Sequence, residues 1–258
     1  GDELAEWAQP SEPEAGAGGD EFLENAPEIP RRVEYGELWQ LGDHFMLCGD
    51  STNPDDVARL MRGERAALMA SDPPYNVNIE YGESVDDAKS DAAYETFSRA
   101  WLSNWSAISE RQIVTPGGQN LMLWARWFDP YHIAAWTKPF STTNGKVAHL
   151  WSWEPIFFFG VKWPRKRAND IFEYPVQYDP KLRGLHPCPK PLPMWVDLYE
   201  NYTEHGDIVV DAFGGSGTAI IAAERSGRRA RVCEIEPKYA DVIIARWEAE
   251  TGRQAERV

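Results

Sequence analysis

The stretch that decides the fold of this chain runs from Ile208 to Thr218 and has the sequence Ile-Val-Val-Asp-Ala-Phe-Gly-Gly-Ser-Gly-Thr. The β-branched residues before Asp211 predict a buried strand, and residues 219–225 predict a helix. A glycine loop between a strand and a helix presents backbone N–H groups to a ligand, because glycine takes positive φ and lets the backbone approach closely. A second predicted strand, residues 231–233, ends at Glu234, where an acid is placed to hold ribose hydroxyls. We therefore expect a ligand that carries a ribose on this loop.

A second landmark is Asp72-Pro73-Pro74-Tyr75, which follows an apolar run at residues 66–70 that predicts a buried strand. Proline fixes φ and lacks an N–H, so this segment does not continue as a helix. We expect the carbonyls of Ser71 and Pro73 to be free to accept hydrogen bonds. Asp72 adds a charged acceptor and Tyr75 a flat stacking face, a set that suits the amino edge of a nucleobase. The alternative is an ordinary turn at the exit of a strand.

These two segments together resemble the amino-group DNA methyltransferases, and the order of the segments resembles the β class of that family. Three further segments carry the resemblance: Cys48-Gly49-Asp50-Ser51, His186-Pro187-Cys188-Pro189-Lys190-Pro191 and Glu234-Ile235-Glu236-Pro237-Lys238-Tyr239. Cys188 and Pro189 depart from the Thr and Gln that the family has at these positions. The resemblance covers residues 36–252. This part of the chain is similar to the methylase part of ParB-like/methylase fusion proteins.

The alternation of predicted strands and helices indicates an α/β fold: a doubly wound, mostly parallel sheet with helices on both faces, the Rossmann-like methyltransferase fold. Ligands of such sheets lie beyond the carboxyl ends of the strands, at the switch point. We therefore expect the strand that ends at Ser71 and the strand that ends at Asp211 to be neighbours.

The resemblance implies S-adenosylmethionine (SAM) as the cofactor. Phe213 to Gly217 would back its methionine half, Asp211 would meet its ammonium group, and Glu234 would bind its ribose. Lys190 is a candidate for the methionine carboxylate, or else a surface lysine at a helix start. Asp50 either contacts the cofactor or caps a turn. The candidate cofactor residues are Asp50, Asp72, Lys190, Asp211, Phe213, Gly214, Gly215, Ser216, Gly217, Thr218 and Glu234, and the candidate catalytic residues are Asp72, Pro73, Pro74 and Tyr75.

The expected reaction is methyl transfer to the exocyclic amino group of a base flipped out of double-stranded DNA, because that amino group is otherwise paired. Asp at the first position of the Asp-Pro-Pro-Tyr motif resembles the adenine-directed members, whereas cytosine-amino members more often have Ser there. The alternatives are a cytosine-N4 enzyme, an amine methyltransferase that acts on RNA or protein, and a non-catalytic module that keeps the fold. No metal site is expected.

The densest basic segment consists of Lys162, Trp163, Arg165, Lys166 and Arg167. Basic side chains interleaved with an aromatic ring can neutralise phosphates and stack on a base, so we predict DNA contact here. The alternative is a solvated loop whose Trp packs on its own sheet. Target-recognition insertions are expected at about 76–91 and 162–185.

The net charge of −15 contains −9 from residues 1–30, which hold no Lys or Arg. Residues 1–33 are therefore expected to form an acidic flexible linker or tail, and residues 34–258 the methyltransferase domain. In similar chains such a linker can follow a ParB-like domain, so the resemblance implies one upstream of Gly1. Family members often dimerise, which makes a homodimer one assembly to test. The chain shows no export signal, no membrane-spanning run and only three scattered cysteines, so we expect a cytoplasmic, nucleoid-associated protein.

The remaining apolar patterns predict the elements between these motifs. They are helices at 55–61, 94–108, 130–136 and 193–201, and strands within 38–48 and at 120–124, 147–151 and 155–161.

Overall fold

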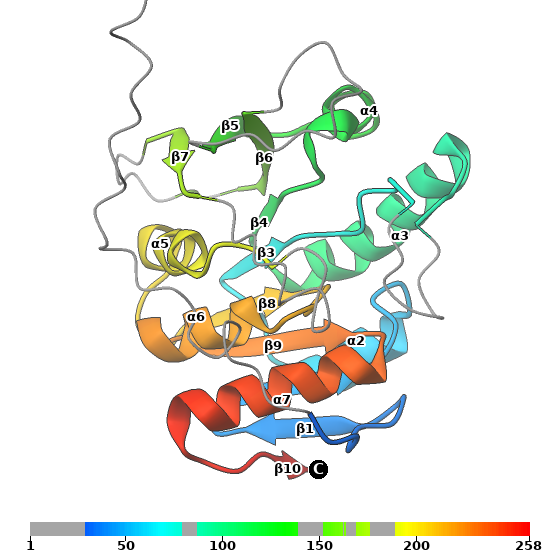
Figure 1. Ribbon diagram of the computed structural model, residues 1–258. Coiled ribbons are helices and arrows are strands. Elements are labelled where there is room, and N and C mark those ends of the chain that lie inside the picture. The colour runs from blue at the N-terminus through cyan, green and yellow to red at the C-terminus, as the bar shows by residue number, and fades with distance from the viewer. Residues whose placement is uncertain (1–28, 79–86, 139–151, 162, 164–168, 176–188) are drawn as a thin grey trace, which may run out of the picture.

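The computed structural model describes residues 29–78, 87–138, 152–161, 163, 169–175 and 189–258. Within these residues a sheet of ten strands has the order β10-β1-β2-β9-β8-β3-β4-β6-β5-β7 (Figure 1). The strands are β1 (Leu38–Leu41), β2 (His44–Cys48), β3 (Leu68–Ser71), β4 (Arg111–Val114), β5 (His132–Thr137), β6 (Trp153–Gly160), β7 (Ile171–Glu173), β8 (Ile208–Asp211), β9 (Arg229–Glu234) and β10 (Glu256–Arg257).

Helices cover both faces of this sheet (Figure 1). One core cluster packs α5, α6 and α7 against the sheet, and a second cluster packs α2, α3 and α4 against the opposite face. The helices are α2 (Pro54–Met61), α3 (Asp91–Ile108), the 3-10 helix η1 (Gly118–Asn120), α4 (Leu121–Trp127), α5 (Leu192–Tyr202), α6 (Thr218–Ser226) and α7 (Pro237–Thr251). None of the helices described here is long and apolar enough to cross a membrane.

The centre of the sheet is parallel, from β2 through β9, β8 and β3 to β4. At one margin β10, β1 and β2 pair antiparallel, and at the other β4, β6 and β5 pair antiparallel while the edge strand β7 is parallel to β5. The chain leaves β8 through α6 to β9 on one side, and leaves β3 through α3 to β4 on the other. The prediction of a doubly wound, mostly parallel sheet is therefore confirmed, with its switch point between β8 and β3.

The helices with clear sequence patterns form where they are expected. Asn53 caps α2 by accepting from the N–H of Asp55 at 3.0 Å, and Pro54 occupies the first turn. In α3, Tyr94, Trp101 and Trp105 are buried on one face, which matches their spacing of seven and four residues.

Two predicted elements are wrong. Residues 120–124 were predicted as a strand, but they end η1 and begin α4, and the strand of this region is β4, which precedes Pro116. A short apolar run does not distinguish a strand from a buried helix. Residues 130–136 were predicted as a helix, but they lead into β5, because pairing with β6 overrides the local preference. The predicted strand at 155–161 is confirmed as β6, and the one at 147–151 lies outside the described residues.

Arg32 and Val33, at the end of the segment predicted as an acidic tail, contact α7. The N–H groups of Arg32 and Val33 donate to Asp241 Oδ1 at 2.9 and 3.0 Å, and Val33 is buried. The packed domain therefore begins at or before Arg32.

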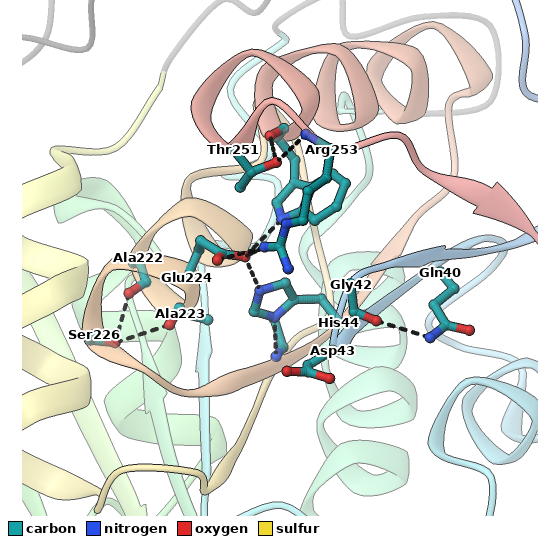
Figure 2. A network of polar contacts seen from close by, with 12 residues as sticks. Gln40, Gly42, Asp43, His44, Ala222, Ala223, Glu224, Ser226, Thr251 and Arg253 are labelled. Carbon is teal, nitrogen blue, oxygen red and sulfur yellow. Dashed lines mark hydrogen bonds and ion pairs between the residues drawn. The ribbon is translucent and has the colours of Figure 1, made fainter.

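A polar network ties β2 to α6 and α7 (Figure 2). His44 Nδ1 accepts from the N–H of Ala230 at 2.9 Å, so Nε2 carries the hydrogen and donates to Glu224 Oε2 at 2.9 Å. Trp247 Nε1 and Arg253 also donate to Glu224, at 2.9 and 2.6 Å. These donors, His44 first among them, lower the pKa of Glu224 to about 2.

We expect Glu224→Gln to destabilise the protein at pH 7, and the difference from wild type to vanish in acid. Because the pKa of this carboxyl is depressed in the folded state, its stabilisation is present above pH 4.5 and is lost as pH falls towards 2. The shift corresponds to roughly 2–3 kcal/mol at neutral pH. Thermal and urea unfolding between pH 3 and pH 7 measure it. Glu95→Gln, at an exposed ion pair on α3, is the matched control and should change little. Equal stabilities of wild type and Glu224→Gln at pH 7 would contradict the expectation.

Candidate functional site

The two sequence landmarks meet at one edge of the sheet. Strands β3 and β8 pair in parallel through Leu68 with Val209 and Met69 with Val210, as the sequence predicted. Ser71 Oγ accepts from the N–H of Ala212 at 2.9 Å, which joins the segment before Asp72 to the start of the glycine loop. Asp72 and the loop therefore share the carboxyl rim at the switch point.

Asp72 is held by three donors from three parts of the chain. Its Oδ1 accepts from the hydroxyls of Tyr75 at 2.9 Å and Thr115 at 2.6 Å, and its Oδ2 forms an ion pair with Lys190. Burial raises the pKa of Asp72, and the charge of Lys190 opposes that rise. The result is a fixed carboxylate with a single cation beside it among the described contacts.

The carbonyls of the Asp-Pro-Pro-Tyr segment are more engaged than we expected. The Ser71 carbonyl accepts from the N–H of Thr115 at 3.1 Å, so the prediction that it is free is wrong. The Pro74 carbonyl accepts from Tyr94 Oη at 2.9 Å, and the Tyr75 carbonyl from Asn120 Nδ2 at 2.7 Å. No described residue donates to the Pro73 carbonyl. Asp72 and Pro73 are therefore the acceptors that this segment offers to a ligand.

The Tyr75 ring is fixed from both ends. Its hydroxyl lies 2.9 Å from Asp72 Oδ1 and 3.0 Å from Glu154 Oε2, and burial first, then these carboxylates, raises its pKa well above 10. Its ring lies where a Cβ on Gly117 would come within 2.6 Å, so only glycine fits there, at φ +82°. Lys190 Nζ lies 4.9 Å from the centre of the ring.

Sequence reasoning missed Thr115, Glu154 and Lys138 as members of this site. Thr115 directly follows the buried end of β4, and a polar residue at the carboxyl end of a parallel strand is the signal that could have found it. Glu154 and Lys138 come from β6 and the end of β5, and only the pairing of these strands places them here.

The glycine loop is bound to Glu234. Gly215 N–H donates to Glu234 Oε2 at 2.7 Å, and Glu236 N–H donates to Oε1 at 2.9 Å. A Cβ on Gly214 would lie 2.6 Å from Val232, and Gly217 has φ +83°, so glycine is required at both positions. Burial raises the pKa of Glu234 to about 7.

Asp211 is a buried carboxyl at the start of the same loop. Its Oδ1 accepts from the N–H of Phe213 at 3.0 Å, and burial raises its pKa well above the usual range. The charged groups near it are the acids Asp72 and Glu234, and no cation of the described residues pairs with it. The ionised form of such a group is stabilised by a cationic ligand.

Phe213, Ser216 and Thr218 of the predicted cofactor set contact the neighbouring helices α3 and α7. Phe213 packs its ring edge-to-face on Trp101 at 5.1 Å. The buried Arg246 of α7 donates to the Ser216 carbonyl at 2.8 Å and to Thr218 Oγ1 at 3.3 Å. The loop is therefore held in place without a ligand.

Asp50 and Lys190 both contact other residues of the protein. Asp50 Oδ1 accepts from the N–H and hydroxyl of Thr52, both at 2.8 Å, so it caps the turn after β2. Lys190, expected at the methionine carboxylate, lies on Asp72.

Most of the predicted DNA-contacting segment, namely Lys162, Arg165, Lys166 and Arg167, lies outside the described residues. The Trp163 ring packs against Phe158 at 5.1 Å and Tyr202 at 5.2 Å, on its own domain. Of the insertion at 76–91, residues 79–86 are likewise outside, and Asp87 fixes its base by accepting from Asn76 and Val77 N–H groups at 2.7 and 3.0 Å.

Comparisons with known proteins agree with this arrangement. A family model described as DNA methylase, of the N6/N4 type, matches residues 129–245. The Type II methyltransferase M.HpaI of Haemophilus parainfluenzae is 23% identical over 241 residues, covering 81% of this chain and 75% of that protein. The crystal structure of the M1.HpyAVI–SAM complex has a TM-score of 0.56 and 17% identity, covering 78% of this chain and 98% of the other. The cytosine-N4-specific PvuII DNA methyltransferase has a TM-score of 0.57 and 17% identity, covering 81% and 93%.

The solved neighbours have the Rossmann-like fold of DNA methyltransferases, and the same fold is seen here. The sequence matches extend over four-fifths of the chain. In sequence this chain is similar to the amino-group (N6/N4) DNA methyltransferases, and its fold is that of the solved structures of such enzymes.

Proposed function

We propose that this chain is a SAM-dependent DNA methyltransferase that methylates the exocyclic amino group of an adenine flipped out of the duplex. The observation that carries the proposal is the meeting of β3 and β8, which puts Asp72 and the glycine loop at one rim. A donor and an acceptor held at neighbouring loops react as one complex, and this gain in proximity can supply much of the rate acceleration.

The residues of the loop fit SAM. Asp211 is a buried carboxyl that lacks a cation among the described residues, and the ammonium group of a methionine moiety supplies one. Glu234 keeps carboxylate lone pairs beyond its two backbone contacts, which suits ribose hydroxyls. The absence of a side chain at Gly214 lets the loop pack directly on Val232 and Ile243. When bound, SAM supplies a methyl group on a sulfonium that leaves as a neutral thioether. The M1.HpyAVI relative was crystallised with SAM.

The Asp-Pro-Pro-Tyr segment fits the acceptor. Asp72 and the Pro73 carbonyl accept the two hydrogens of the target amine, which directs the nitrogen lone pair to the methyl carbon. With SAM bound, an N–C bond would form as the methyl–sulfur bond of the sulfonium breaks, and the Asp72 carboxylate would take the proton that the nitrogen loses. Burial of Asp72 makes it a better proton acceptor than an exposed aspartate.

Adenine is the proposed base because the motif begins with Asp. Cytosine-N4 is the second candidate, since the PvuII enzyme shares the fold. The basic segment at 162–167 is the proposed DNA contact, and the ring of its Trp163 packs against Phe158. The order of the two motifs argues against glutamine-directed protein methyltransferases, which place the glycine loop first.

The test is methylation of mixed-sequence duplex DNA with methyl-labelled SAM, followed by digestion to nucleosides and mass analysis. We expect N6-methyldeoxyadenosine from the wild type and none from Asp72→Ala. N4-methyldeoxycytidine in its place would support the second candidate. RNA and a glutamine-containing peptide form parallel arms, and methylation of either one without DNA methylation would overturn the proposal.

A further inference from the structure

Five side chains form a continuous polar row at the acceptor side of the site. Lys190 pairs with Asp72, Tyr75 bridges Asp72 to Glu154, and Glu154 pairs with Lys138. The row thus contains two ion pairs joined through one phenol hydroxyl. The proposed reaction uses Asp72 and the Pro73 carbonyl, and it gives no role to Glu154 or Lys138.

The hydroxyl of Tyr75 has two acceptors for one hydrogen. Asp72 Oδ1 lies at 2.9 Å and Glu154 Oε2 at 3.0 Å, and an ionised carboxylate only accepts. Because both oxygens are already within hydrogen-bond distance, rotation of the hydrogen alone moves the bond from one carboxylate to the other. The ring of Tyr75 does not have to move.

Glu154 is held in place by the antiparallel part of the sheet. It lies in β6 opposite Trp136 of β5, and Lys138, just after β5, donates its backbone N–H to the Ser152 carbonyl at 2.8 Å. The side chains of Lys138 and Glu154 are 12% and 14% exposed, so their ion pair is largely shielded from water. Glu154 is therefore a fixed second acceptor.

We propose that Glu154 is a positioning residue of the methyl-transfer site. It accepts the hydrogen bond from the Tyr75 hydroxyl when the target amine donates to Asp72. This inference rests on the proposed function. Oδ1 of Asp72 already accepts from Tyr75 and Thr115, so an amine hydrogen can bind to this oxygen only when one of the two donors leaves it. When the Tyr75 hydroxyl turns to Glu154, an acceptor position on Asp72 Oδ1 becomes available to the amine. The buried hydroxyl still has a hydrogen-bond partner.

The charged groups around Asp72 come from several elements. Lys190 precedes α5, Glu154 with Lys138 comes from the β5–β6 pair, Asp211 lies at the end of β8, and the Tyr75 phenol lies in the same segment. Glu154 acts on Asp72 in two ways: its charge raises the pKa of Asp72, and the hydroxyl of Tyr75 lies between the two carboxylates. Only the second effect depends on that hydroxyl.

Glu154→Gln tests the inference because Lys138 dictates how the amide turns. The amide oxygen faces the Lys138 ammonium, so the NH2 group faces Tyr75, and the hydroxyl can then donate only to Asp72. We expect kcat to fall about tenfold, the effect of one hydrogen bond to a charged group. The acid limb of the kcat profile should move to lower pH, because loss of the Glu154 charge and the permanent hydrogen bond both lower the pKa of Asp72.

The control is the double-mutant cycle with Tyr75→Phe, read as kcat on DNA with SAM binding and melting temperature measured alongside. We expect Glu154→Gln to lower kcat no further in the Tyr75→Phe background, at a pH on the plateau of the profile where the direct charge effect on Asp72 is absent. If Glu154→Gln does not fold, Glu154→Met with Lys138→Met replaces the ion pair by apolar side chains and also leaves Tyr75 a single acceptor.

An unchanged kcat for Glu154→Gln, or a loss that adds fully to that of Tyr75→Phe, would overturn the inference while wild-type activity upholds the proposed function. A wild type that methylates no DNA would overturn both.

Discussion

Asp72→Asn should reduce kcat for DNA methylation by about 10³-fold and leave SAM binding within a few-fold of wild type. The amide has one acceptor oxygen in place of two, while Tyr75, Thr115 and Lys190 all present donors to this position. One of these three donors therefore faces the NH2 group of the new amide in place of an acceptor oxygen. Lys190 also loses its buried counter-charge. Loss of a preorganised group at the reacting atom is typically worth 10²–10³, about 3–4 kcal/mol, and the misplaced donor adds to it.

Single-turnover methylation with saturating SAM measures the chemical step, and calorimetry measures SAM binding. Asp43→Asn is the matched control, since Asp43 is exposed in the turn between β1 and β2, away from the rim that carries Asp72, and it should retain wild-type rates. A methylation rate of Asp72→Asn within tenfold of the wild-type rate would show that the carboxylate does not bind the amine hydrogens in the reaction.

Lys190→Met should reduce kcat at pH 7 by roughly 10–100-fold, and the activity should recover at higher pH. Removal of the cation leaves only the Thr115 hydrogen bond to oppose burial, so the pKa of Asp72 rises further above its ordinary value. The active carboxylate form is lost as pH falls through that raised pKa, and the acid limb of the kcat profile therefore shifts upward. A purely structural defect would not be reversed by base.

The same variant separates two roles for Lys190. If Lys190 instead binds the methionine carboxylate, as the sequence predicted, Lys190→Met should raise the KM for SAM by a large factor and leave the pH profile of kcat in place. Lys190→Arg keeps the charge and is the matched variant. It should retain the wild-type position of the acid limb even if its bulk lowers the rate.

The strand, glycine loop and helix at residues 208–226 could be predicted because each part depends on neighbours in the sequence. A β-branched run, glycines with positive φ at 215 and 217, and a following helix are local features. The same holds for α2 and its Asn53 cap. The errors at 120–124 and 130–136 lie where short apolar runs fit both kinds of element and pairing with β6 decides.

The sequence by itself determined the parallel core of the fold, the Asp72 segment and the glycine loop, because periodicity, turn residues and motif order are written in adjacent positions. The tertiary structure alone decided the partners of Asp72. Lys190 is 118 positions away along the chain, Thr115 is 43 away, and Glu154 reaches Tyr75 across 79. No local pattern specifies such contacts, because they arise from the order and register of strands in the sheet, and burial then makes them strong enough to set the ionisation of the site.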